Sequence, residues 1–179
     1  MRRTRVCVVF GCNRNNHAGW SKIFMSDYWI TTYWPIPVSA PPFSRHVYVK
    51  EHRVSLPKPG AIVFVRESIS ATVSGRQVRT ATMYHQGPQR QFQVPRGSGG
   101  IIGTMTVDGV LRPIRPEDVV FDFGDVREWS IVPCKGFRAA SFPLIDLLSL
   151  LGKGNPRFLS LWHVPDEELG LKLLRSLRR

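Results

Sequence analysis

The stretch AIVFV at residues 61–65 decides the fold, because it is the clearest strand signal in the chain. All five residues are apolar, and three of them are Ile or Val. The turn-forming segment LPKPG at residues 56–60 comes directly before it. A short apolar run bounded by proline and glycine is typical of a β-strand. We therefore predict a protein built around a sheet that contains this strand.

Further strand-like segments occur on both sides of residues 61–65, separated by turns. The chain has 14 Pro and 15 Gly, which fits short strands and turns better than long helices. We expect a hairpin around Ser74-Gly75, a bulge at Gly103 and a turn at Asp108-Gly109. The predicted strands are residues 5–10, 46–50, 61–65, 78–84, 101–111, 129–132 and 158–162.

Two helices are predicted in the last third of the chain. In the first, Ser141 is a candidate N-cap, Pro143 sits early, leucines form an apolar face and Gly152 ends the helix. The second runs from about residue 165 to 178, with acids in its first turn and bases towards its end, which complements the helix dipole. This order of elements indicates an α+β domain: a small curved sheet or β-barrel with two or three helices packed at its ends.

The length and composition predict one domain, residues 1–179, with a basic, aromatic-rich N-terminal part at residues 1–56. Hydrophobic residues make up 42% and charged residues 21%, as in soluble globular proteins. No run of about 18 apolar residues occurs, and the apolar residues 6–10 are too few for a secretory signal. Three cysteines make no disulfide framework. We therefore expect a cytoplasmic protein that contacts no membrane.

The whole chain has a net charge of +12, and this positive charge is concentrated in its first three-fifths. Residues 1–107 contain 14 basic and 3 acidic side chains, whereas residues 108–179 contain 11 and 10. Such a field attracts polyanions, because neutralising phosphates releases condensed counterions. Of the 25 bases 19 are Arg, whose planar guanidinium suits phosphate and bases. A GC-rich genome would favour Arg but would not remove acids, so we predict contact with RNA or DNA.

The candidate nucleic-acid-binding side chains fall into two groups. Aromatic residues between positions 20 and 34 form a candidate platform for stacked bases, and core packing is the alternative for each ring. These aromatic residues are Trp20, Tyr28, Trp29, Tyr33 and Trp34. The candidate phosphate contacts are Arg45, Arg53, Arg76, Arg79, Arg90 and Arg96.

An ordered set of segments resembles the PUA-like superfamily, in particular its EVE and ASCH branches. KPGAIVFVRES at residues 58–68 resembles a basic residue, a glycine, an apolar strand and a serine of that family. GIIGTMTV at residues 100–107 resembles its next strand, and WSIV at residues 129–132 a later strand that opens with Trp. The helices and the closing strand complete the resemblance, which covers residues 57–178. A basic insert at residues 69–99 departs from a compact EVE domain.

The resemblance implies a domain that binds RNA or DNA and holds one base, modified or unmodified, in an aromatic pocket with a basic rim. It places Ser68 near the pocket rim, beside Arg66. We therefore predict a non-catalytic nucleic-acid-binding module. Two alternatives stay open. One is an ASCH-like hydrolase that acts on a nucleoside or RNA with Lys58, Glu67 and Thr104. The other is a basic protein that docks an acidic partner.

No cofactor and no metal are predicted. Cys7, Cys12 and His17 lack the closely spaced ligand pairs of a structural zinc site. No nucleophile elbow, HExxH motif or P-loop occurs, so no catalytic residue is assigned. An acidic segment offers carboxylates for a divalent cation, but we favour a solvated loop. Its acids are Asp118, Asp122, Asp125 and Glu128.

Overall fold

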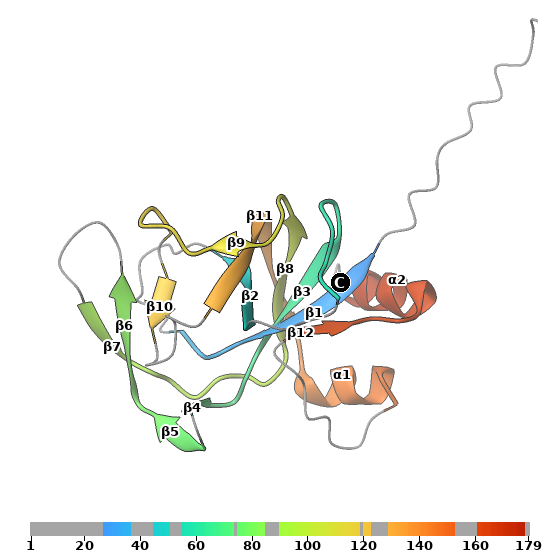
Figure 1. The fold of residues 1–179 in the computed structure, drawn as a ribbon. Helices are drawn as coiled ribbons and strands as arrows, with labels where there is room; N and C mark the ends of the chain where they lie inside the picture. Colours follow the sequence, from blue (N-terminus) through green and yellow to red (C-terminus); the bar gives the residue numbers. More distant parts are fainter. Residues whose placement is uncertain are drawn as a thin grey trace, which may run out of the picture.

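The computed structural model describes most of the second half of the chain and parts of the first. The described residues are 27–36, 45–50, 55–73, 75–84, 90–118, 120–122, 129–152 and 161–177. Within them the chain forms one large sheet, two small sheets and two helices (Figure 1). The strand predicted at residues 5–10 lies outside this part.

The large sheet curls strongly into a half-barrel (Figure 1). Its strands follow the order β12-β1-β3-β8-β11-β2, and β9 pairs with β11. The outer strands β12 and β2 approach each other, as expected of a sheet that bends towards closure. The seven strands traced in the described residues are β1 (Tyr28–Tyr33), β2 (His46–Lys50), β3 (Ile62–Glu67), β8 (Ile101–Val107), β9 (Arg112–Pro113), β11 (Trp129–Phe142) and β12 (Leu161–His163).

Strand β3 carries the AIVFV stretch and lies inside the sheet, parallel to β1 and antiparallel to β8. Val63 and Val65 face one core, together with Met105 of β8. Phe64 faces the opposite side and packs beneath the helices. A strand that is covered on both faces has a continuous run of apolar residues in its sequence. The strand predicted at residues 61–65 is therefore confirmed.

Helices α1 (Leu144–Leu150) and α2 (Glu167–Ser176) cover one face of the large sheet, where Leu147 and Leu173 pack against Phe64. As predicted, acids open α2, and Asp166 caps it by accepting a hydrogen bond from the N–H of Glu168 (2.9 Å). Neither helix is long and apolar enough to cross a membrane.

The predicted Ser141 cap of the first helix is wrong. Strand β11 continues to Phe142, which pairs with Ile101 of β8, so Ser141 is still part of the sheet. The helix instead begins after Pro143, without a side-chain cap. Pairing with β8 therefore overrides the local capping preference. The coarse prediction of an α+β fold with a curved sheet is confirmed.

The insert, together with β10, forms two small sheets at one side of the large sheet (Figure 1). The predicted hairpin around residue 75 is present, with Ala71 opposite Val78. A small core of the insert includes Met83, and Ile36 packs both against this core and against the main one. Ile36 therefore fixes the insert to the half-barrel. The strands of the two sheets are β4 (Ala71–Val73), β5 (Arg76–Val78), β6 (Thr80–Tyr84), β7 (Arg90–Gln93) and β10 (Val120–Asp122).

Candidate nucleic-acid interface

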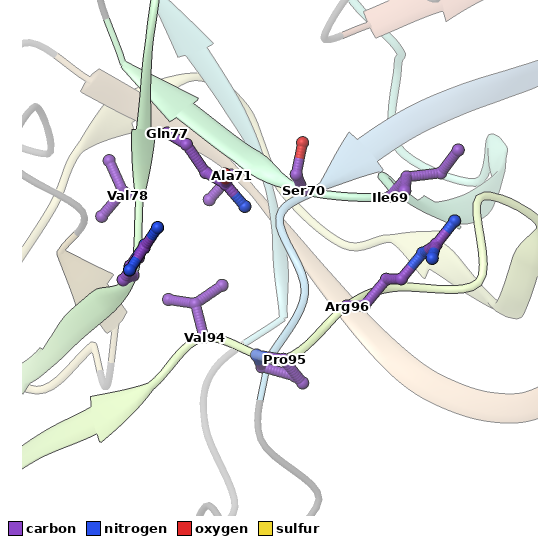
Figure 2. Close-up of a pocket in the computed structure, with 9 residues that line it drawn as sticks. Ile69, Ser70, Ala71, Gln77, Val78, Val94, Pro95 and Arg96 are labelled. Atoms are coloured by element: carbon purple, nitrogen blue, oxygen red, sulfur yellow. The ribbon is translucent and has the colours of Figure 1, made fainter.

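A hollow of about 310 Å³ lies in the insert, between the β4–β5 hairpin and the segment that follows β7 (Figure 2). Aliphatic side chains provide most of its wall. These are Ile69, Ala71, Val78, Val94 and Pro95. Four polar side chains complete the lining, namely Ser70, Gln77, Arg79 and Arg96. Among these nine residues none is aromatic.

Backbone hydrogen bonds enclose this hollow at both ends. At one end the N–H of Val94 donates to the carbonyl oxygen of Arg79 (2.8 Å). At the other end the N–H of Gly97 donates to the carbonyl oxygen of Ile69 (2.9 Å). The β4–β5 ladder connects the two lining segments along the side. The shape of the hollow is therefore set by backbone pairing and not by side-chain packing alone.

The end of β3 leads directly into the rim of the hollow. The N–H of Ser68 donates to the carbonyl oxygen of Tyr33 (2.8 Å), and its hydroxyl donates to the carbonyl oxygen of Ser70 (2.8 Å). The Glu67 carboxylate accepts a hydrogen bond from the N–H of Ser98 (2.7 Å). Ser68, predicted near a pocket rim, thus lies one residue before the lining, and its hydroxyl holds the backbone of that lining.

Four of the six arginines predicted as phosphate contacts lie in the insert, and all four are exposed. They are Arg76 and Arg79 in or after β5, Arg90 in β7 and Arg96 beyond it. The chain has no Asp or Glu between residues 68 and 107, and β10 brings Asp122 alongside β6. Little negative charge therefore offsets these arginines within the described part of the insert.

The remaining predicted basic residues are placed differently. Arg45 is half-buried, with its guanidinium carbon 3.9 Å from the centre of the Phe137 ring, and burial lowers its pKa. Arg66 is also half-buried, and burial lowers its pKa as well. Both lie on the large sheet, outside the exposed group in the insert. Arg53 lies outside the described residues.

For Trp29 the core-packing alternative holds. Its side chain is 4% exposed, and its indole N–H donates to the Asp27 carboxylate (2.8 Å). Tyr28 and Tyr33 are buried as well. No ring face of these three residues is open to a base, because strands and helices cover both sides of β1. We therefore leave Trp29 out of the candidate interface.

Among the described aromatic residues, Trp34 is connected to one end of the hollow through its neighbour Pro35. It is half-buried and precedes Pro35, and a Cβ built on Gly97 would lie 2.8 Å from the Pro35 ring. Gly97 in turn follows Arg96, which lines the hollow. Trp20 lies outside the described residues.

The residues of the hydrolase alternative are not brought together. Lys58 precedes β3, whereas Glu67 ends it, and a strand of this length spans about 17 Å. Thr104 lies in the middle of β8. No group of three His, Cys, Asp or Glu side chains suited to a metal ion occurs in the described ranges. Within the described residues, these three side chains therefore do not form a catalytic site for the hydrolase alternative.

Asp118 is buried in an ionic network, so the prediction that it belongs to a solvated acidic loop is wrong. Its side chain is 6% exposed and accepts two hydrogen bonds from the Arg112 guanidinium (2.7 and 2.8 Å). The N–H of Arg115 donates a third (2.8 Å), and Nε2 of His46 lies 3.3 Å away. Nδ1 of His46 accepts from the N–H of Cys134 (3.4 Å), which leaves the Nε2 proton for Asp118.

This network joins the large sheet to the sheet of the insert. Asp118 is two residues from the start of β10, and β10 pairs with β6. Its partners His46 and Arg112 lie on β2 and β9 of the large sheet. Arg112, Arg115 and Asp118 are close together in the chain, but His46 is distant from them. No sequence motif predicts this network, because its residue types are common.

The stability of the protein is expected to fall on acidification. Hydrogen bonds from Arg112 hold the pKa of Asp118 at about 2, below 3.8, and burial lowers the pKa of His46 below 6.5. Both groups therefore take up protons more readily in the unfolded chain. The free energy of unfolding should fall below pH 6.5 through His46 and below pH 3.8 through Asp118.

Urea denaturation across this pH range measures the effect. A His46→Gln variant should lose the part of the decline that begins near pH 6.5 and keep the part at lower pH. A wild-type stability that is constant from neutral pH to pH 3 would contradict the network.

Comparisons of this chain with protein-family models, with curated proteins and with solved structures find no match.

Proposed function

We propose that this protein binds nucleic acid through the exposed arginines of the insert. The proposal rests on two exposed arginines, Arg79 and Arg96, that line one hollow. Two more exposed arginines lie on β5 and β7, and this stretch of chain has no Asp or Glu. Contacts with the phosphate backbone dominate the affinity of most nucleic-acid-binding proteins. A surface with this charge supplies such contacts.

The fold is compatible with this proposal. A small, strongly curved sheet accompanied by helices is what the PUA-like resemblance of residues 57–178 implies, and we propose that the chain is of this type. Nucleic-acid binding is the activity that the resemblance implies. The phosphate contacts would come from the insert, which distinguishes this chain from a compact EVE domain.

Binding of labelled oligonucleotides at several salt concentrations tests the proposal. The logarithm of the affinity should fall linearly with the logarithm of the salt concentration, with a slope of about −0.7 for each phosphate contacted on a single strand. RNA and DNA of mixed sequence are measured side by side. A slope near zero would exclude nucleic acid. Tighter binding of an acidic polypeptide than of either oligonucleotide would instead support the acidic-partner alternative.

Removing two charges from the hollow should weaken binding in a salt-dependent way. In an Arg79→Gln, Arg96→Gln double variant the salt slope on a single strand should decrease by about 1.4, because each phosphate contact contributes about 0.7. A matched control is Lys172→Gln with Arg175→Gln, which removes two exposed charges from α2. Helix α2 lies at the opposite side of the molecule from β5, β6 and β7 (Figure 1). Equal effects of the two double variants would mean that net charge alone attracts the ligand.

A further inference from the structure

The hollow carries its positive charge at its two ends. Arg79 lies at the end that the Val94 hydrogen bond closes. Arg96 precedes Gly97, whose N–H closes the other end, and Figure 2 shows the Arg96 side chain extended towards Ile69 at that end. A ligand that contacts both arginines therefore needs two anionic groups, one on each side of the hollow.

Both aliphatic and polar side chains line the wall between the two arginines. Val78, Val94 and Pro95 line it, and Gln77 and Ser70 add an amide and a hydroxyl that can donate and accept hydrogen bonds. A volume of about 310 Å³ lies at the lower end of the range for small-ligand pockets. The middle of the ligand is therefore one compact unit with apolar faces and a few polar edges.

We propose that the hollow seats one nucleoside of a single strand, with the phosphates on its two sides held by Arg79 and Arg96. This inference rests on the proposed function and names its substrate class, an unpaired strand of nucleic acid. A nucleoside in a duplex is stacked and paired, so entering the hollow would require unpairing. The surroundings favour a strand over a free small dianion, because exposed Arg76 and Arg90 continue the positive charge beyond the hollow.

Two probes of equal charge separate this inference from general phosphate binding. One is a single-stranded homopolymer, and the other is an abasic strand of the same length. Burying about 60 Å² of apolar surface is worth about tenfold in affinity, so the strand with bases should bind about tenfold more tightly. The salt slopes of the two should agree, because the phosphates are the same. A duplex of the same length should bind more weakly than the single strand.

The outcomes distinguish the inference from the proposed function. Equal affinities for the two strands would overturn the inference and leave the proposed function standing. Loss of salt-dependent binding to every oligonucleotide would overturn the proposed function itself. A nucleoside 3′,5′-bisphosphate that binds as tightly as the strand would assign the hollow to a free small ligand and would also overturn the inference.

A variant that fills the hollow tests the location. Val78→Phe replaces the isopropyl group of the lining by a larger, aromatic side chain and leaves every arginine in place. Val78→Ile is the conservative control. The Phe variant should lose the preference for strands with bases and keep its salt slope. A preference unchanged in a folded Val78→Phe protein would show that the bases bind elsewhere. The abasic comparison on the wild-type protein stays decisive if this variant does not fold.

Discussion

Replacing Asp118 by Asn is expected to lower the free energy of unfolding by about 3 kcal/mol, because removing one partner of a buried ion pair leaves the other uncompensated. The Asp118 side chain is 6% exposed, and the Arg112 side chain that it binds is 21% exposed. The partial exposure of Arg112 lets water replace some of the lost interaction, so the loss should lie at the lower end of the range for buried pairs. Urea denaturation of the two proteins at neutral pH measures it.

The chain offers a matched control for this change. Asp108 forms an ion pair with Lys135, but the two side chains are 47% and 66% exposed. Exposed pairs contribute about 0–1 kcal/mol, so Asp108→Asn should leave the stability nearly unchanged. Similar losses in the two variants would show that Asp118 is not buried as described.

The Asp118 substitution should also loosen the insert, which carries the candidate nucleic-acid interface. Asp118 holds the chain just before β10, and β10 pairs with β6 of the insert. Without this anchor, backbone amides of β6 should exchange hydrogen faster, because the sheet of the insert is then held to the large sheet by fewer contacts. Amides of β3 should keep their protection, since this strand lies inside the large sheet.

Local signals predicted the elements that depend on neighbouring residues. The strand at residues 61–65, the hairpin around residue 75 and the second helix are of this kind. Their signals are a bounded apolar run, the turn residues Ser74-Gly75, and acids at a helix start. In the structure Gly75 has a positive φ, as such a turn requires. In each of these three elements, the residues that set the structure lie within the element itself.

Strand β1 shows why other elements escaped prediction. Its sequence, YWITTY, is rich in large aromatic rings, which favours a binding cluster when the sequence is considered alone. In the structure Tyr28 lies beneath the helices and Trp29 faces the half-barrel core, so both faces of the strand are covered. The strands that pair with it, β3 and β12, are distant in sequence. The burial of these rings is therefore a tertiary property.

The hollow, like the burial of the β1 rings, depends on tertiary structure. Its lining comes from three segments of the insert, and none of them contains a ligand-binding motif. Charge counting singled out Arg79 and Arg96 as exposed basic residues, but it gave no reason to place them on one cavity. Their association depends on the hydrogen bonds of Arg79 with Val94 and of Ile69 with Gly97. Long-range backbone pairing of this kind has no signature in a single sequence.

Replacing Gly97 by Ala is expected to lower the free energy of unfolding by about 2 kcal/mol, in the range for overpacked sites. A Cβ at this position would overlap the carbonyl oxygen of Ser68 and would lie 2.9 Å from the Glu67 side chain. The carbonyl group belongs to the backbone, so it can move only together with the segment that follows β3. Thermal and urea denaturation measure the loss.

The same substitution should open one end of the hollow, because the N–H of Gly97 closes that end through its hydrogen bond to Ile69. The preference for a strand with bases over an abasic strand should therefore decrease, while the four exposed arginines keep most of the salt slope. Gly109→Ala is the control, since the atoms nearest to a Cβ there belong to the Pro133 side chain, at 3.2 Å or more, and not to the backbone. A Gly97→Ala protein with wild-type stability and base preference would contradict the close crossing of the two segments and, with it, the hollow that depends on this crossing.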